Sequence, residues 1–94
     1  MKNFVKSLLL KKLVKKLPIL EVCKKFDNYS NYLPSELKPI IQNLCEEGEF
    51  KIPEKLFIEF SGGGFQVGRE DGDDLVIIHT VEELEEALKE EGII

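Results

Sequence analysis

The sequence predicts an α+β domain in which N-terminal helices precede a three-stranded antiparallel β-meander and a C-terminal α-helix. Three observations support this prediction. The run Leu-Phe-Ile-Glu-Phe at positions 56–60 is the densest group of β-branched and aromatic residues, two glycine-marked turns follow it, and a capping-box pattern opens the last helix. A length of 94 residues suits a single domain, with residues 1–47 helical and residues 52–92 forming the meander and an acidic helix.

Residues 4–17, rich in leucine and lysine, form the first predicted helix. At about 100° per residue, its apolar side chains fall on two faces rather than one. One face holds Phe4, Val5, Leu8 and Leu9, and the other holds Leu10, Leu13, Val14 and Leu17, with Lys11, Lys12, Lys15 and Lys16 opposite the second. The helix must therefore break near Ser7 or present its first face to a second surface, such as another subunit in a homodimer through residues 4–17. A membrane surface needs a single apolar face, so no membrane association is expected.

Two further helices are expected before the meander. Pro18 suits the first turn of the second helix, and Gly48 ends the third, which is predicted over residues 39–47. A polar loop at 27–32 and a turn at 34–38 separate them. The core-facing residues are Ile19, Leu20, Cys23 and Phe26 on the second helix, and Ile40, Ile41, Leu44 and Cys45 on the third.

Cys23 and Cys45 lie on these apolar stripes and lack the short spacing of metal or redox motifs. The sequence therefore favours buried free thiols, with a disulfide between the two helices as the alternative. No apolar run approaches the roughly 20 residues that span a bilayer. The run Leu8-Leu9-Leu10 is followed directly by two lysines, which excludes the apolar core of a signal peptide. We expect a cytoplasmic protein.

The register of the meander follows from its turns. Gly62-Gly63 and Asp71-Gly72 are predicted as two-residue hairpin turns, which also place Arg69 opposite Asp74. The buried face is then Leu56, Ile58, Phe60, Phe65, Val67, Val76 and Ile78. The other face is half polar and open to solvent or to a partner, and it holds Phe57, Glu59, Gln66, Gly68, Leu75, Ile77 and His79. The alternative for residues 53–60 is a helix with Pro53 at its first position.

The last helix has the clearest signals. Thr80 followed by Glu83 forms a capping box, and Gly92 marks the end. The buried stripe is Val81, Leu84, Ala87 and Leu88.

Charge is divided unevenly along the chain, whose net charge is −5. Residues 1–25 carry eight lysines and one glutamate, a net +7, and residues 26–94 carry five basic and seventeen acidic groups, a net −12. Either the basic segment docks on the acidic body, or the surface has two poles that select different partners.

No pattern of catalytic residues is present. Gly62-Gly63-Gly64 is followed by Phe65 rather than by the Lys-Ser/Thr of a phosphate loop. The acidic run at 70–74 lacks the alternating ligands and terminal glutamate of a calcium-binding EF-hand loop. His79 is the sole histidine, so no two-histidine metal site can form. We expect no enzymatic activity, no cofactor and no metal.

The motif order over residues 39–91 supplies one resemblance. The motifs are the pair Ile52-Pro53, the stretch from Ser61 to Phe65 that contains three glycines, the apolar run at 75–79 and the acidic helix at 82–88. This order is similar to that of the SUKH family of bacterial immunity and scaffold proteins. Members of that family bind toxins or other proteins and are not enzymes, so the resemblance implies a protein-binding role.

The sequence therefore predicts a small, non-catalytic protein-interaction module, of an inhibitor or immunity type, with an acidic partner-binding surface and a basic partner. The expected binding residues are Phe57, Glu59, Glu70, Asp71, Asp73 and Asp74. The alternative is a winged-helix-like regulator that binds nucleic acid through Lys11, Lys12, Lys15 and Lys16. Glu46 and Glu47 on the candidate reading helix repel phosphate and argue against that alternative.

Overall fold

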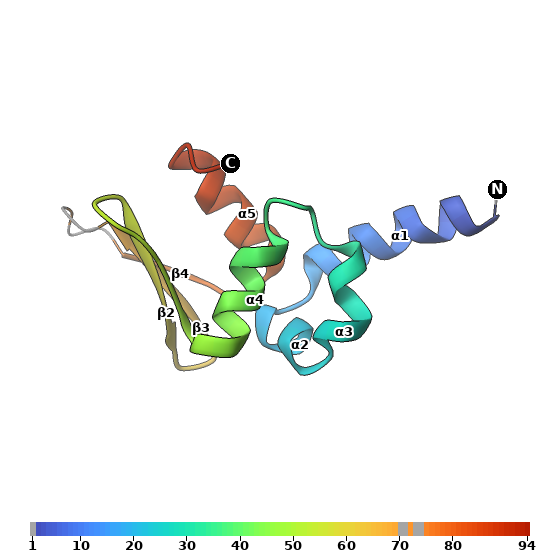
Figure 1. The fold of residues 1–94 in the computed structure, drawn as a ribbon, viewed down its shortest axis with the longest axis horizontal. Coiled ribbons are helices and arrows are strands. Elements are labelled where there is room, and N and C mark those ends of the chain that lie inside the picture. Colours follow the sequence, from blue (N-terminus) through green and yellow to red (C-terminus); the bar gives the residue numbers. More distant parts are fainter. Residues whose placement is uncertain (1, 70–71, 73–74) are drawn as a thin grey trace.

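The fold combines a helical layer with one antiparallel sheet (Figure 1). The computed structural model describes residues 2–69, 72 and 75–94, with side chains from Leu8 onward. The helices are α1 (Lys2–Lys16), α2 (Ile19–Lys24), α3 (Phe26–Tyr29), the 3-10 helix η1 (Ser30–Tyr32), α4 (Lys38–Glu47) and α5 (Val81–Glu90). The strands are β1 (Glu49–Ile52), β2 (Leu56–Ser61), β3 (Gly64–Arg69) and β4 (Leu75–Ile78). The predicted α+β class is confirmed.

The sheet has four strands within the described residues, in the order β1-β2-β3-β4, so the predicted number of three is wrong. The additional strand is β1, which pairs antiparallel with β2 so that Phe50 faces Ile58. Its four residues alternate between exposed and half-buried. A turn at 53–55 joins β1 to β2, and Glu54 adopts a positive φ of 67° there. Because residues 56–61 form β2, the helical alternative for residues 53–60 is wrong.

The predicted register of the meander is confirmed wherever it is described. Phe60 faces Phe65 and Val67 faces both Ile58 and Val76. The residues Asp71 and Asp74, and with them the second turn and the proposed pairing with Arg69, lie outside the described residues.

Most of the predicted inner face is buried, but two of its members are not. Leu56, Ile58, Phe65, Val67 and Ile78 belong to the core. Phe60 is 53% exposed and Val76 is 55% exposed, so the prediction that both are buried is wrong. Val76 lines an open groove between α5 and the sheet and is not part of the core. The Phe60 ring instead meets Phe65 edge-on, with centroids 5.7 Å apart.

The core is formed where α4, α5 and the first two helices meet the sheet. Its helical members are Val14, Ile19, Val22, Ile40, Ile41, Leu44, Val81, Leu84 and Leu88, and Leu33 and Leu37 join them from the connection between η1 and α4. The predicted stripes of α4 and α5 are confirmed for these residues, whereas their other members, Cys45 and Ala87, are half-buried. Val22 is a core residue that the predicted face of α2 omitted. Backbone hydrogen bonds from Ile19 N to His79 O and from Val81 N to Leu17 O fix the junction of α1 and α2 against the start of α5.

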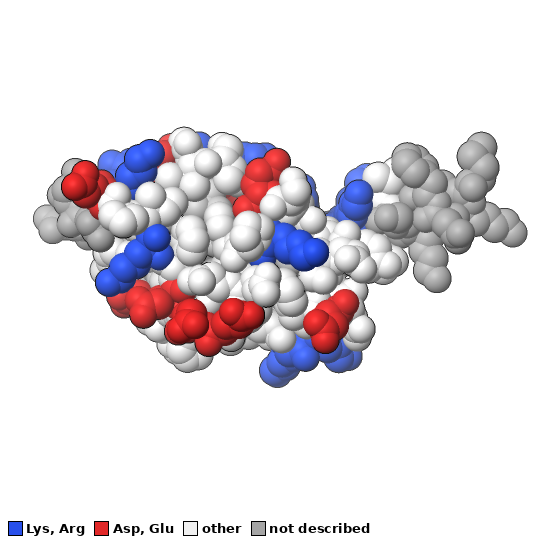
Figure 2. All heavy atoms as spheres, viewed as in Figure 1, with Lys and Arg blue, Asp and Glu red and all other residues white. Residues whose placement is uncertain are grey.

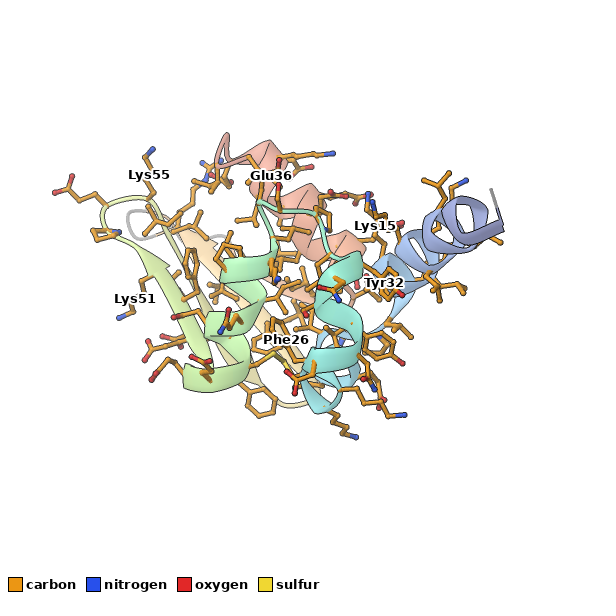
Figure 3. The ribbon with its side chains drawn as sticks, turned by 45° about the vertical axis from the view of Figure 1, so that its right-hand side comes forward. Lys15, Phe26, Tyr32, Glu36, Lys51 and Lys55 are labelled. Atoms are coloured by element: carbon orange, nitrogen blue, oxygen red, sulfur yellow. A yellow bond between two sulfur atoms is a disulfide. The ribbon has the colours of Figure 1, made fainter. Side chains whose placement is uncertain are left out.

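Cys23 and Cys45 form a disulfide, so the prediction of free thiols is wrong. Both residues do lie on apolar stripes, but α2 and α4 pack together and bring their Cα atoms within 5.2 Å. This separation lies in the range that a disulfide bridges. Spacing in the sequence carries no information on which helices become neighbours. The bond is visible in the centre of Figure 3.

Helix α1 is continuous from Lys2 to Lys16 and projects away from the body (Figure 1). Of the two alternatives for this segment, the break near Ser7 is therefore wrong. Val14 is buried and holds the last turns of α1 on the core. Leu8, Leu9 and Leu13 are 44%, 56% and 59% exposed, so Leu13 does not join the buried stripe on which it was predicted. The side chains of Phe4 and Val5 lie outside the description.

Candidate partner-binding site

An acidic groove lies between α5 and the inner face of the sheet. Its floor is apolar, from Leu56, Val67, Val76 and Ile78, and its helical wall consists of Glu83, Glu86, Ala87 and Glu90. Glu91, just past α5, and Gly68 and Arg69 of β3 complete the lining. Its volume is about 380 Å³. The glutamates Glu83, Glu86 and Glu90 follow one another at i, i+3 and i+7, so they share one face of the helix beside its buried leucine stripe. The groove therefore offers carboxylates above an apolar surface.

Two of the groove carboxylates have partners within the protein. The Glu83 side chain accepts hydrogen bonds from the backbone N–H groups of Thr80, at 3.0 Å, and His79, at 3.1 Å. These bonds, chiefly that from Thr80, lower the pKa of the Glu83 carboxyl. Arg69 Nε donates to both oxygens of Glu91, at 3.0 and 2.9 Å.

Glu86 and Glu90 differ from these two. Neither forms an ion pair or hydrogen bond with another described side chain, and both are exposed. They are the carboxylates of the groove that remain available to a cation from outside.

The outer face of the sheet carries a smaller apolar patch made by Phe57, Leu75 and Ile77. Phe57 and Leu75 converge over Gly68, where an added Cβ atom would lie 2.8 Å from Phe57 Cζ and 2.5 Å from Leu75 Cδ2. Phe57 is half-buried as a result, whereas Leu75 and Ile77 are 52% and 47% exposed. The half-open outer face that the sequence predicts is thus present.

Glu59, another predicted binding residue, is exposed on this outer face opposite Glu49. Both residues lie near the end of α4, where Glu46 and Glu47 are also exposed. Figure 2 shows a row of acidic side chains along this side of the molecule. The predicted residues Glu70, Asp71, Asp73 and Asp74 lie outside the described residues. Phe57 and Glu59 are not among the residues that line the α5 groove.

A second, basic cleft separates α1 from the segment at 31–35. Lys11, Lys12 and Lys15 line it, together with Leu8, Asn31, Tyr32, Leu33, Pro34 and Ser35, and its volume is about 500 Å³. Figure 3 shows Lys15 and Tyr32 facing the same space from α1 and η1. Lys16, the fourth predicted phosphate contact, is exposed and does not line the cleft.

Sequence reasoning did not identify Glu86 and Glu90 as binding residues. The sequence does show that both glutamates lie beside the leucine stripe of the last helix. It did not predict the exposed apolar floor of the groove, because Val76 was expected to be buried. In the part of the chain that the structure describes, no three His, Cys, Asp or Glu side chains are grouped as metal ligands. No described helix is both long and apolar enough to cross a membrane.

Comparison with known proteins found no match to a protein-family model, a curated protein or a solved structure.

Proposed function

We propose that the protein is a non-catalytic interaction module that binds a basic segment of another protein in the α5 groove. The supporting observation is that Glu86 and Glu90 lie beside the exposed apolar side chain of Val76. Lysine and arginine side chains match this arrangement, because their aliphatic stems can lie on an apolar floor while their charged ends reach carboxylates. The net charge of −12 over residues 26–94 adds long-range attraction for such a partner.

An inhibitor or immunity role is the form of this function that we favour. Proteins that act on nucleic acid carry basic grooves that bind phosphate, and an acidic surface can occupy such a groove in place of phosphate. The exposed glutamates of α5 and the acidic row near Glu49 and Glu59 would both contribute.

Capture of partners from the lysate of the native host tests the proposal. The bait is compared with a Glu86→Lys/Glu90→Lys variant, and the matched control is Glu21→Lys/Asp27→Lys, which reverses two exposed charges on α2 and α3, away from both acidic surfaces. We expect a basic protein that is captured by wild type and by the control but lost with the groove variant. Equal capture by all three baits would exclude the groove as the binding surface.

Nucleic-acid binding is a second candidate, favoured by the basic cleft. Three lysines, of which Lys15 is paired with Glu85, line this cleft together with Asn31, Tyr32 and Ser35, whose polar groups suit contacts to phosphate. A salt titration of binding to random-sequence duplex DNA tests it. Binding at low salt that weakens on Lys11→Glu/Lys12→Glu substitution would support this candidate, and no binding at low salt would eliminate it.

The disulfide is evidence about the cellular compartment in which the protein is located. Disulfides persist in oxidising compartments and are rare in the reducing cytosol, so Cys23–Cys45 favours an oxidising location over the cytoplasmic one expected from the sequence. Trapping of thiols with an alkylating reagent in intact host cells distinguishes the two. Two alkylated cysteines would indicate a cytoplasmic, reduced protein.

A further inference from the structure

The two edges of the sheet are built differently. At the β1 edge, Glu49 and Lys51 are exposed charges, a common protection against pairing with another strand. Strand β4, at the opposite edge, has the sequence Leu-Val-Ile-Ile and carries no charge. Leu75, Val76 and Ile77 are about half exposed, and β3 is the only described strand that pairs with β4. The isolated antiparallel bridge between Pro18 and Thr80 lies past the C-terminal end of β4, so it leaves residues 75–78 open to a further strand. An uncharged, exposed edge strand is a template for the addition of a further strand.

The two faces of β4 have different surroundings. On the outer face, Leu75 and Ile77 continue the apolar patch that begins at Phe57. On the inner face, Val76 lies in the groove with Glu86 and Glu90. Because successive side chains of a strand point to opposite faces, a strand added beside β4 would place every second side chain at the carboxylates and the others at the apolar patch.

We propose that β4 accepts an extended segment of the partner protein in which lysine or arginine alternates with apolar residues. Backbone hydrogen bonds to β4 provide affinity, and the alternation provides selectivity. This inference rests on the proposed function and specifies how the basic partner is held.

Charge argues against a second copy of this chain as the occupant. Antiparallel pairing of two β4 strands about a two-fold axis keeps both α5 helices on the same face of the joined sheet. Glu86 and Glu90 of both copies would then face a shared interface, and each copy carries a net charge of −5. A basic strand relieves this repulsion, whereas a second copy increases it.

A synthetic peptide tests the proposal with the full chain. The probe is acetyl-Val-Lys-Val-Lys-Val-Lys-amide, and its binding is measured by calorimetry at low salt. We expect binding, with hydrogen exchange of the β4 amides slowed at least tenfold, and no binding of the peptide in which glutamate replaces lysine. Failure of the lysine peptide to bind, or equal binding of the glutamate peptide, would overturn the proposal.

Backbone methylation separates strand addition from simple charge attraction. Two peptides are compared, one N-methylated on its valines and the other on its lysines, so that each has one edge blocked. Because one edge must face β4, at least one of them should bind more than tenfold more weakly. Binding of both within twofold of the unmodified peptide would contradict strand addition.

Variants of the protein complete the test. Ile77→Lys places a repelling charge at the β4 edge and should weaken peptide binding more than tenfold, while Leu9→Lys, at a similarly exposed position on α1, should leave it within twofold. If binding resists Ile77→Lys and methylation but is lost in Glu86→Lys/Glu90→Lys, the groove function stands and strand addition is wrong. Protection of the β4 amides that grows with protein concentration alone would identify a second copy as the occupant.

Discussion

Lys15 on α1 and Glu85 on α5 form an ion pair, with Nζ and Oε1 3.2 Å apart. This pair joins the basic N-terminal segment to the acidic helix, and Lys15 also lines the basic cleft together with Lys11 and Lys12. The docking interpretation of the charge division therefore holds at Lys15, at the end of α1. A second pole that selects its own partner stays a prediction.

A double-mutant cycle with Lys15→Met and Glu85→Gln should give a coupling free energy of about 0.5–1 kcal/mol, the upper part of the range for surface ion pairs. The reason is that the Glu85 side chain is only 13% exposed, whereas that of Lys15 is 36% exposed. Urea unfolding of the four proteins measures the coupling. It should shrink in 1 M salt, and a coupling that is unchanged by salt would mean that the pair acts through packing.

Removal of the disulfide should destabilise the fold. The bond closes a loop with a sequence separation of 22 residues, for which loop entropy predicts a stabilisation of about 3 kcal/mol. Urea unfolding measures the effect. Relative to oxidised wild type, the reduced wild type and the Cys23→Ser/Cys45→Ser variant should show similar decreases in the free energy of unfolding. The variant should be insensitive to reductant, and equal stability of oxidised and reduced wild type would contradict the expectation.

The capping box of α5 predicts a dependence of stability on pH. The folded pKa of Glu83 is lowered, so the carboxylate stabilises the fold above its unfolded pKa of about 4.3, and this contribution is lost as pH falls through the folded pKa. Wild type should therefore lose more stability than Glu83→Gln on acidification from about pH 5 to pH 3. Parallel pH profiles would contradict the role of Glu83.

Thr80→Ala removes the other half of the same cap. The Thr80 hydroxyl accepts a hydrogen bond from Glu83 N at 3.1 Å and donates one to the Glu83 carboxylate, and its loss should cost about 1 kcal/mol near neutral pH. Thermal unfolding monitored by circular dichroism measures the change.

Alanine substitutions at the neighbouring glycines Gly64 and Gly63 can be compared directly, because one position is crowded and the other is open. A Cβ atom at Gly64 would lie 2.5 Å from the backbone oxygen of Ile78, whereas one at Gly63 would have no neighbour within 4 Å. Gly64→Ala should therefore cost about 1–3 kcal/mol because β3 and β4 must separate locally, and Gly63→Ala should change stability by less than about 0.5 kcal/mol. Equal changes in the free energy of urea unfolding for the two variants would show that β4 accommodates the Cβ atom at position 64 without a loss of stability.

Self-association through α1 remains a proposal supported by the exposure of Leu8, Leu9 and Leu13. If a homodimer forms there, light scattering at high concentration should give twice the mass of the chain. The Leu9→Glu/Leu13→Glu variant should then be monomeric with unchanged circular dichroism. A monomeric wild type would exclude this interface.

Local signals in the sequence were sufficient for much of the fold. The hairpin at Gly62-Gly63, the cap at Thr80 and the stop at Gly48 depend on neighbouring residues, and all three are present. Strand β1 shows the alternating pattern of a strand, because Phe50 and Ile52 alternate with Glu49 and Lys51. A run of four residues between a glycine and a proline was too short to distinguish from a loop.

The remaining features depend on which elements become neighbours. The disulfide requires α2 to pack on α4, and the exposure of Phe60 and Val76 depends on how far the helices extend over the sheet. The groove follows from the same partial coverage. Periodicity identifies which residues of an element can be buried, but it does not reveal whether another element reaches them.

The projecting helix α1 gives the molecule an elongated shape, with principal extents of 48 × 25 × 17 Å. The described lysines of α1 (Lys11, Lys12, Lys15 and Lys16) lie toward one end of this axis, and the sheet, with the glutamates of α5, lies toward the other. The chain therefore has a substantial electric dipole moment along its long axis. In the field of a basic partner this dipole would turn the sheet toward the partner before contact, which favours rapid, correctly oriented association at low ionic strength.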